Sequence, residues 1–318
     1  MSITTSSPKS DLGLMVELEG VAEQEVNRHL SMADEWFPHQ YVPYGRGRDY
    51  DGVLEGGQGW EPGDSKITPE SKDSLLVNLL TEDNLPGYHF AIRDAMGEEG
   101  PWGFWVNRWT AEENRHGIVI RDYLTVTRAL DPVVLERERM KHLQVGYKMP
   151  YGNDLLRGLT YVAFQELATR LSHRNTGKAS GDPLCEQMLA RVAKDENLHM
   201  IFYRNMIGAA MQVAPGQTVQ AIADVVTTFE MPGNTIDGFL RKSVSIANAG
   251  IYDLRLHHDD VVMPVLRKWG VFETTTLDAE GEQAREKIAT FVARLDAAAT
   301  KFEDRRAERA ARKAARKA

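Results

Sequence analysis

The sequence has 318 residues, of which 42% are hydrophobic and 26% are charged, so it can bury a large core and lacks the composition of a disordered chain. Its single cysteine, Cys185, excludes an internal disulfide and any iron–sulfur cluster held by four thiolates of this chain. No run approaches the roughly 18 apolar residues of a membrane helix, and residues 1–11 lack a basic segment followed by an apolar stretch. We therefore expect a cytoplasmic protein in which any metal has nitrogen and oxygen ligands.

The net charge of −8 conceals a difference between the body of the chain and its end. Residues 301–318 contain eight Lys/Arg and three Asp/Glu, a balance of +5, which leaves −13 for the remainder. Such a segment is compatible with nucleic acid, an acidic lipid surface or an acidic protein as partner. An end rich in Ala, Arg and Lys is more often a solvated helix, so we expect a basic helical or frayed tail and no nucleic-acid partner.

Apolar residues recur with the period of a helix along most of the chain, and almost no segment alternates as a strand does. Residues 37–66 are rich in Gly, Pro, Asp and aromatics, which predicts an irregular segment packed on the helices. We expect one domain over residues 1–300 and a tail over 301–318. The predicted helices cover residues 11–29, 68–82, 103–129, 132–143, 154–173, 183–211, 218–229, 235–269 and from 279 into the tail.

The helix that begins near residue 68 has clear signals at both ends. Thr68 can cap it, and Pro69 suits the first helical position. Pro86 lacks the N–H that would bond the carbonyl of Glu82 in a regular helix. We therefore expect a local distortion beside Glu82.

Two Glu-x-x-His motifs stand out in this sequence: Glu113 with His116, and Glu196 with His199. The composition gives about one such motif by chance, so a single occurrence would say little. At positions i and i+3 a carboxylate and an imidazole share one face of a helix and can reach one metal ion. Both motifs have apolar neighbours, so we expect these faces to point inward.

A weak internal repeat places a further glutamate ahead of each motif. Glu82 precedes Glu113 by 31 residues, and Glu166 precedes Glu196 by 30. The same order therefore occurs twice: a helix with one inward glutamate, then a helix with Glu-x-x-His. This arrangement is typical of ferritin-like di-iron and di-manganese carboxylate bundles. We predict an all-α fold with such a four-helix core and additional flanking helices.

Four carboxylates and two imidazoles suit a pair of redox-active first-row metal ions, with iron favoured and manganese second. We expect Glu113 and Glu196 to bridge the ions, with Glu82 and Glu166 at the two ends. Taken singly, a glutamate is usually solvated and a histidine is more often hydrogen-bonded than metal-bound. Together these residues favour a metal site, because the alternative leaves several charged groups on apolar helix faces without compensation.

With these residues in view, the sequence resembles the soluble acyl-[acyl-carrier-protein] desaturases, most closely their mycobacterial and other actinobacterial branch. The resemblance extends from about Leu14 to Phe302. The matching segments are Thr-Glu-Asp-Asn-Leu-Pro at 81–86, Arg-Trp-Thr-Ala-Glu-Glu-Asn-Arg-His at 108–116, Phe-Gln-Glu-Leu-Ala-Thr at 164–169, Ser-His-Arg-Asn-Thr at 172–176 and Asp-Glu-Asn-Leu-His at 195–199.

The resemblance implies a reaction in which two electrons and dioxygen remove two hydrogens from a long-chain fatty acyl group on acyl carrier protein, giving a cis double bond and water. It implies electrons from a ferredoxin and its reductase, since the sequence has neither a dinucleotide fingerprint nor cluster cysteines. It also implies a homodimer. The iron ligands that it implies are Glu82, Glu113, His116, Glu166, Glu196 and His199.

Three further site residues follow from the resemblance. Thr169, three residues after Glu166, matches a threonine that lines the oxygen pocket; the alternative is a helical threonine bonded to its own backbone. Asp195 and Trp60 match a carboxylate and an indole that lie with His116 on an electron route. Acids of this kind orient ligating imidazoles.

The resemblance is weaker at the surface that docks the carrier. Plant members have two basic residues inside the second motif, where this sequence has Asn197 and Leu198. The docking surface is therefore expected to differ in detail. The candidate cations are Arg115, Arg121, Arg128, Arg137, Arg139 and Lys141.

Three other functions remain open on the residues alone. A di-iron hydroxylase or N-oxygenase would use the same ligands to make the same oxidant. A ferritin-like protein that binds and oxidises iron would also need them, although the chain is longer than a minimal bundle and its extra helices suggest a covered substrate tunnel. A purely structural helical protein would lack bound metal.

Overall fold

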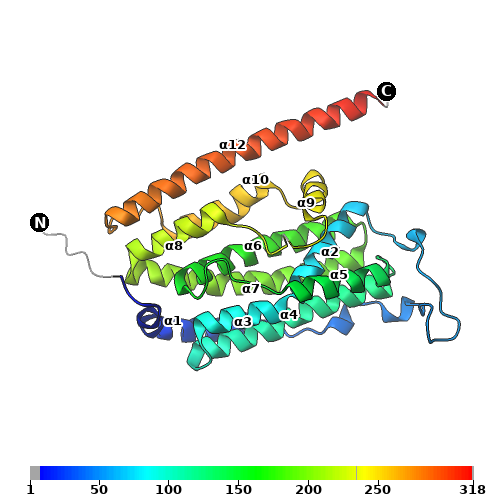
Figure 1. The fold of residues 1–318 in the computed structure, drawn as a ribbon, viewed down its shortest axis with the longest axis horizontal. Helices are drawn as coiled ribbons and strands as arrows, with labels where there is room; N and C mark the ends of the chain where they lie inside the picture. Colours follow the sequence, from blue (N-terminus) through cyan, green and yellow to red (C-terminus); the bar gives the residue numbers. More distant parts are fainter. Residues whose placement is uncertain (1–7, 234, 317–318) are drawn as a thin grey trace, which may run out of the picture.

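The computed structural model describes residues 8–233 and 235–316, and α-helices dominate this part of the chain (Figure 1). The described residues contain no strand, only an isolated β-bridge between Tyr50 and Gln58. The α-helices are α1 (Asp11–Met32), α2 (Pro69–Asp83), α3 (Leu85–Met96), α4 (Gly100–Val126), α5 (Pro132–Val145), α6 (Leu155–Ser180), α7 (Pro183–Val213), α8 (Pro215–Thr228), α9 (Phe239–Asn248), α10 (Leu254–Leu256), α11 (Met263–Trp269) and α12 (Ala279–Ala315).

Four helices, α2, α4, α6 and α7, form the centre of the molecule, and α1, α3, α5, α8 and α9 pack around them (Figure 1). Helices α6 and α7 lie side by side and bury residues on nearly all their faces. They approach closely at Gly177, where an added Cβ would lie 3.0 Å from the Cα of Glu186. Fully buried Trp105, Phe164 and Phe202 belong to one hydrophobic core, in which Trp105 of α4 stacks on Phe202 of α7. The all-α fold expected from the helical period is therefore confirmed.

The start of α2 agrees with its sequence signals. The Thr68 side chain accepts a hydrogen bond from the backbone N–H of Ser71 at 3.3 Å, and Pro69 is the first helical residue. The distortion expected from Pro86 is also present, because α2 ends at Asp83 and α3 begins at Leu85. The break places Glu82 in the last turn of α2. Sequence analysis did not predict α3 as a separate helix.

The prediction of a single helix over residues 235–269 is wrong. The segment contains α9, a turn, α10, a π-helical stretch over His257–Val262 and then α11. Gly250 ends α9 with φ +72°, and its N–H donates to the carbonyl of Ala247 at 3.1 Å. Asp253 then caps α10 by accepting from the N–H of Leu256 at 3.0 Å. A glycine in a left-handed conformation stops a helix whose apolar period otherwise continues.

The irregular segment 37–66 contains three short 3₁₀ turns, at Pro38–Gln40, Tyr44–Arg46 and Pro62–Asp64. Arg128, just after α4, fixes this segment to the bundle. Its guanidinium donates to the carbonyls of Gln58 and Gly59 at 2.9 and 2.5 Å and to the carboxylate of Asp64 at 2.8 Å. The segment is therefore ordered against the helices, as its composition indicated.

The end of the chain is helical as far as it is described. Helix α12 runs unbroken from Ala279 to Ala315, along the upper edge of Figure 1. The expected basic tail is thus the last part of one long helix, although Lys317 lies outside the described residues. The division into a domain over 1–300 and a tail over 301–318 stays a prediction.

None of the described helices combines the length and the apolar character needed to cross a membrane.

Candidate metal centre

The four central helices bring the six predicted ligands to one buried place. Helix α2 supplies Glu82, α4 supplies Glu113 and His116, α6 supplies Glu166, and α7 supplies Glu196 and His199. The i and i+3 spacing of each Glu-x-x-His motif makes one helix face present both side chains. All six are buried, and both imidazoles have no exposed surface.

The six side chains form two overlapping sets that could each hold a metal ion. One set is Glu82, Glu113, His116 and Glu196; the other is Glu113, Glu166, Glu196 and His199. Within each set one donor atom per residue lies within 4.8 Å of the others. Glu113 and Glu196 belong to both sets, the arrangement expected of carboxylates that bridge two ions.

Glu113 is oriented toward both histidines. Its Oε2 lies 3.1 Å from Nδ1 of His116, and its Oε1 lies 2.7 Å from Nδ1 of His199. His116 Nδ1 is also 3.4 Å from Oε1 of Glu196, and His199 Nδ1 is 3.6 Å from Oε2 of Glu166. Each histidine therefore presents Nδ1 to the same carboxylate cluster.

Several donor atoms at the centre of this cluster form no aligned hydrogen bond with a described residue. They are Oε1 of Glu113, Oε2 of Glu166, Oε1 of Glu196 and Nδ1 of His199, although the Glu113 and His199 atoms lie close together. Buried polar atoms are rarely left unpaired, because each costs free energy once it leaves water. Their common direction, with two carboxylates shared between the sets, fits a pair of divalent metal ions.

The carboxylates of the cluster repel one another when no cation lies among them. Burial and the neighbouring Glu113 carboxylate raise the pKa of Glu82 and of Glu196 well above the usual range. Burial also opposes ionisation of Glu113, but the nearby His116 and His199 outweigh it and lower its pKa. The dry environment would lower the pKa of both histidines, yet Glu113 and other carboxylates raise it overall. Bound cations would replace these protons as the compensating charge.

Each histidine is held at its outer nitrogen by a carboxylate from the opposite motif. His199 of α7 has Nε2 2.8 Å from Oε2 of Glu112 on α4. His116 of α4 has Nε2 3.4 Å from Oδ2 of Asp195 on α7. A carboxylate at Nε2 accepts its proton and leaves the lone pair of Nδ1 directed at the cluster.

A second aromatic side chain completes each of these pairs. His29 of α1 lies 3.0 Å from Oε2 of Glu112 and stacks on His199, with ring centroids 5.7 Å apart. Trp36 donates to Oδ2 of Asp195 at 2.7 Å and stacks on His116 at 6.3 Å. We call these two matched sets the His29 arm (His29, Glu112, His199) and the Trp36 arm (Trp36, Asp195, His116).

His173 of α6 contacts the cluster from a third direction. Its Nε2 lies 2.9 Å from Oε1 of Glu82, and its Nδ1 lies 3.2 Å from the amide nitrogen of Asn78. Burial, together with the nearby His116, lowers the pKa of His173 to about 3. A neutral imidazole that accepts from Asn78 carries its proton on Nε2 and donates it to Glu82.

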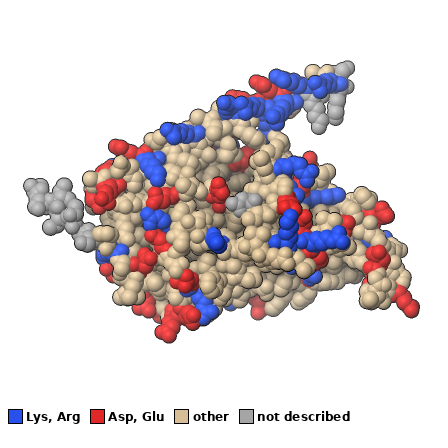
Figure 2. All heavy atoms as spheres, viewed as in Figure 1, with Lys and Arg blue, Asp and Glu red and all other residues tan. Residues whose placement is uncertain are grey.

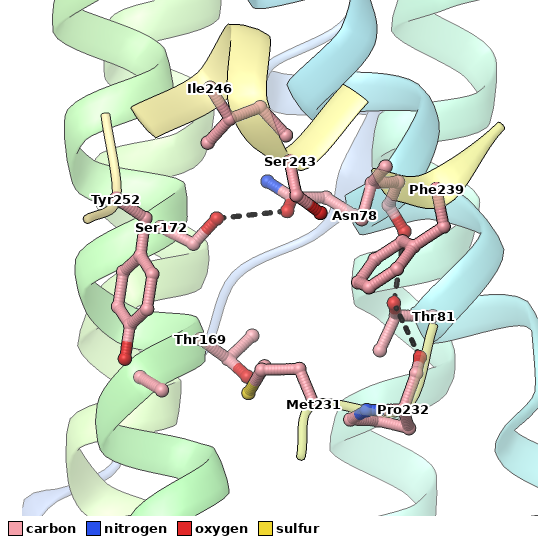
Figure 3. Close-up of a pocket in the computed structure, with 12 residues that line it drawn as sticks. Asn78, Thr81, Thr169, Ser172, Met231, Pro232, Phe239, Ser243, Ile246 and Tyr252 are labelled. Carbon is pink, nitrogen blue, oxygen red and sulfur yellow. Dashed lines mark hydrogen bonds between the residues drawn. The ribbon is translucent and has the colours of Figure 1, made fainter. Parts of the chain in front are cut away.

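A cavity of about 130 Å³ lies beside the cluster, between α2, α6 and α9 (Figure 3). Thr169 and Ser172 of α6 face it from one side and Asn78 and Thr81 of α2 from another. The Thr169 hydroxyl donates to the carbonyl of Gln165 at 2.9 Å. The apolar part of the lining consists of Val77, Ala168, Met231, Pro232, Phe239, Ile246 and the ring of Tyr252.

The comparison with protein families agrees with this geometry. The family described as fatty acid desaturase matches residues 10–318 of the chain. The chain belongs to this family. It is therefore an enzyme of the oxidoreductase class with a ferritin-like all-α fold.

Individual desaturases resemble the chain over most of its length. A Mycobacterium tuberculosis protein named as an acyl-[acyl-carrier-protein] desaturase, DesA1, is 47% identical over 94% of this chain and 90% of its own. The stearoyl-[acyl-carrier-protein] 9-desaturase of Gossypium hirsutum is 29% identical over 98% of this chain and 81% of its own. The X-ray structure of DesA2 from M. tuberculosis, named as an acyl-ACP desaturase, superposes with a TM-score of 0.69 at 29% identity, covering 85% of this chain and 98% of that one.

The indole that contacts Asp195 and stacks on His116 is Trp36. The role expected for Trp60 stays a prediction, and its hydrogen bond lies elsewhere. Trp60 Nε1 donates to the carbonyl of Arg128 at 3.0 Å, so Trp60 fixes the irregular segment to the bundle. Asp195 does lie beside His116, as expected. Its pKa is lowered to about 2, because hydrogen bonding and charge from His116, with help from Arg191, outweigh burial.

Sequence analysis missed Glu112, His29, Trp36 and His173. A signal existed for Glu112, because an acid precedes each motif glutamate: Glu112 before Glu113 and Asp195 before Glu196. His173 follows Glu166 by seven residues and so shares its helix face. His29 and Trp36 gave no local signal, since their contacts join residues 83 and 159 positions apart.

Most cations proposed for carrier docking are already paired in the structure. Arg128 is buried, and Arg115 donates to Asp195 and to the carbonyl of Trp36. The other four lie on α4 and α5. There Arg121 pairs with Asp122 and Glu136, Arg139 with Asp83 and Glu136, and Lys141 with Asp237, while Arg137 is exposed.

Proposed function

We propose that this chain is a di-iron, dioxygen-dependent desaturase that introduces a cis double bond into a long-chain fatty acyl group carried on acyl carrier protein. The observation that supports this most is the pair of ligand sets that share Glu113 and Glu196 beside a largely apolar cavity. The names of the relatives supply the carrier and the acyl class. Relatives named as 9-desaturases and as 4-desaturases share similar identity with the chain, so these names do not define the double-bond position.

Iron is the favoured metal in this proposal, with manganese second. Two imidazoles and four carboxylates suit redox-active first-row ions, and Glu82 and Glu166 would be the terminal carboxylates. The bound pair would supply the oxidant that removes hydrogen from an unactivated carbon. Trp109 supports the arrangement, because its Nε1 donates to Oε1 of Glu166 at 2.9 Å and leaves Oε2 directed at the cluster.

The cavity beside Thr169 is the proposed acyl site. A space of about 130 Å³ holds a group about the size of benzene, so a long chain needs more room. A second, smaller cavity lies next to Trp109 and Gln165, and Pro232 lines both. We place the acyl chain through the first cavity toward the second, which passes it alongside Glu166 and Thr169.

Thr169 is the proposed proton-handling residue at the oxygen side. It follows Glu166 by three residues and lines the cavity, so an acyl chain bound there would pass beside it. A hydroxyl can both donate and accept a hydrogen bond. The hydrogen bond from its hydroxyl to the Gln165 carbonyl also fits the alternative of a helical threonine bonded to its own backbone. A variant that lacks the hydroxyl distinguishes the two roles.

We propose that electrons come from an external ferredoxin and its reductase. The Trp36 arm is the proposed route, because it joins irregular segment 37–66 to His116 through contacting rings and a carboxylate. Arg115 and Arg191 stack over the Trp36 ring at 4.9 and 5.7 Å and hold it in place.

We also propose a homodimer. Helices α3 and α4 expose Phe90, Phe104 and Ile118 at 73%, 48% and 41% of their surface, which is unusual for large apolar side chains in water. In analytical ultracentrifugation the wild type should sediment as a dimer. The Phe90→Ser variant should dissociate into monomers at a higher protein concentration than the wild type does. A monomeric wild type at micromolar concentration would contradict this part of the proposal.

Product analysis tests the function. Iron-loaded protein is incubated with acyl carrier protein bearing a saturated chain, ferredoxin, its reductase and dioxygen, and the acyl product is weighed by mass spectrometry. We expect the loss of two hydrogens, and no such product with Glu113→Ala. Gain of an oxygen atom would indicate a hydroxylase, and iron oxidation without any change in the acyl chain would indicate a ferritin-like ferroxidase.

A further inference from the structure

The outer wall of the cavity is a short basic helix. Phe239, Ser243 and Ile246 of α9 face the cavity (Figure 3). The opposite side of α9 exposes Leu240 and Val244 at 79% and 47% of their surface. Residues 239–248 include two cations, Arg241 and Lys242, and no acid. Helix α9 therefore combines exposed apolar surface with positive charge at the edge of the cavity.

The basic end of α12 is fixed to the same wall. Nη1 of Arg306 donates to the carbonyl of Ala247 at 3.2 Å and to Oδ2 of Asp253 at 2.7 Å. Ala247 follows Ile246, and Asp253 follows Tyr252, both of which line the cavity. Because Arg306 bridges these two points, the end of α12 is held over the segment that closes one side of the cavity.

Beyond Arg306, α12 extends past the body of the molecule (Figure 1). The described residues from 307 to 316 whose side chains can be assessed are all exposed. Arg305, Arg309, Arg312 and Arg316 recur every three or four positions and so form one stripe along the helix. Figure 2 shows Lys and Arg concentrated along this part of α12. We call Leu240, Arg241 and Val244 together with this stripe the α9–α12 surface.

The stripe is available to a partner. In the described part of the chain the one ion pair within it joins Arg312 to Glu308 at 3.6 Å, and both side chains are more than two-thirds exposed. Exposed pairs of this kind contribute little. By contrast, Arg121, Arg139 and Lys141 of α4 and α5 are paired with acids. The remainder of the chain carries −13, so an acidic protein would be repelled over most of the surface and attracted to this region.

We infer that the α9–α12 surface docks the acidic carrier protein, with Leu240 and Val244 as the apolar centre and the arginine stripe as the charged rim. The inference rests on the proposed function, which requires a carrier to deliver a thioester-bound chain into the adjacent cavity. A lipid surface fits less well, because residues 303–316 contain no apolar side chain larger than alanine to enter a bilayer. Nucleic acid fits less well, because Glu308 lies within the stripe and Glu303 and Asp304 directly precede it.

The test compares matched variants of the iron-loaded, full-length protein. Arg305→Gln with Arg309→Gln removes two positive charges from the stripe, and Arg46→Gln with Lys66→Gln removes two from segment 37–66, which is not part of the α9–α12 surface. Affinity for acyl carrier protein is measured at low and high salt. Turnover is measured with acyl carrier protein and with the same acyl chain on free pantetheine, which bypasses docking.

We expect the stripe variant to bind acyl carrier protein about five- to tenfold more weakly at low salt, with a smaller difference at high salt. Its KM for the carrier should rise while kcat and turnover of acyl-pantetheine are unchanged, and the control should match the wild type. Leu240→Ser should weaken binding at both salt concentrations. Equal affinity in the stripe variant and the wild type would overturn the inference, as would an equal loss in the control.

The outcomes for docking and for function are separable. If the wild type desaturates the acyl carrier substrate while the stripe variant retains full affinity, the docking site is wrong and the proposed function stands. If the wild type binds the carrier through the stripe but forms no unsaturated product, the docking site stands and the proposed function fails. Binding of a DNA duplex or of phosphatidylglycerol vesicles that depends on the stripe, with no such dependence for the carrier, would also overturn the inference.

Discussion

Individual contacts around His116 and His199 show how α4 and α7 each orient the histidine of the other helix. Glu112 and Asp195 each precede a motif glutamate and hold the histidine of the other helix, so α4 and α7 exchange supports across the centre. Arg108 donates to Glu112 at 2.6 Å, and Arg191 pairs with Asp195, so each of these buried carboxylates also has a cationic partner. The imidazole orientation therefore depends on residues that do not touch the proposed metal ions.

The two arms permit a matched prediction. His29→Leu should weaken metal binding at the His199 end, because Glu112 loses a partner and His199 loses a stacked ring; Trp36→Phe should act in the same way at the His116 end. Loss of an outer partner typically costs about 10- to 100-fold in metal affinity. Competition with a chelator, followed by the spectrum of bound cobalt, measures each variant. Unchanged release of both ions would contradict the assigned roles.

Substitution of Thr169 tests whether oxygen chemistry can be changed without a change in metal binding. Thr169→Val keeps the shape of the side chain but removes the hydroxyl, and Thr169 is not among the proposed ligands, so iron content should equal that of the wild type. If the hydroxyl positions a proton, unsaturated product should fall while oxygen uptake and peroxide release per double bond rise. Iron content, oxygen uptake and product are measured on the same sample. If the variant uses as much oxygen per double bond as the wild type, Thr169 is only a packed helical residue.

At the scale of helices, the end of α2 sets the position of Glu82. Asn84 separates α2 from α3 with φ −80° and ψ 9°, and Pro86 prevents the two helices from joining. Glu82 thus lies in the last turn of α2, where it meets His173 and the cluster. A continuous helix would carry its carboxylate along a different path.

Pro86→Ala tests this dependence. The substitution restores a backbone donor and lets α2 continue into α3, so Glu82 should bind its metal more weakly. The free energy of unfolding should change by no more than about 1 kcal/mol, because proline at this position acts mainly on the unfolded chain. Metal titration and chemical denaturation of the same variant separate the two effects. Full metal affinity would show that the break does not position Glu82.

The helices also indicate which parts of the fold a sequence can predict. The Glu-x-x-His faces, the Thr68 cap and the break at Pro86 depend on residues within a few positions, and they were predictable. Gly250 splits the expected helix over 235–269, because a glycine at positive φ overrides a continuing apolar period. The contact of Trp36 with Asp195 was not predictable for a different reason: it joins residues 159 positions apart. Trp60 and Trp36 both lie in or beside an irregular segment, so local sequence does not show which indole reaches Asp195.

At the scale of the whole molecule, the buried carboxylate cluster links metal binding to stability. Four carboxylates in a dry core repel one another, as the raised pKa values of Glu82 and Glu196 indicate. Two bound cations would remove that repulsion, and they would bind only the folded chain. The bundle should therefore be less stable without metal.

Metal removal tests this link. At metal concentrations about 100 times Kd, one bound ion stabilises the folded state by about 2.7 kcal/mol, which corresponds to roughly 4 °C in Tm for a chain of this size. Thermal unfolding with a chelator and with added ferrous iron under argon measures the difference. Glu113→Ala should show a much smaller shift, because it lacks a bridging carboxylate. An identical Tm with and without metal in the wild type would contradict the linkage.

The most direct test of the proposed centre is anomalous X-ray diffraction from crystals of the iron-loaded protein at the iron absorption edge. Two peaks per chain are expected, both bordered by Glu113 and Glu196. One should lie next to Glu82 and His116, and the other next to Glu166 and His199. A single peak, a peak outside these residues or no anomalous signal in protein that retains iron would contradict the account.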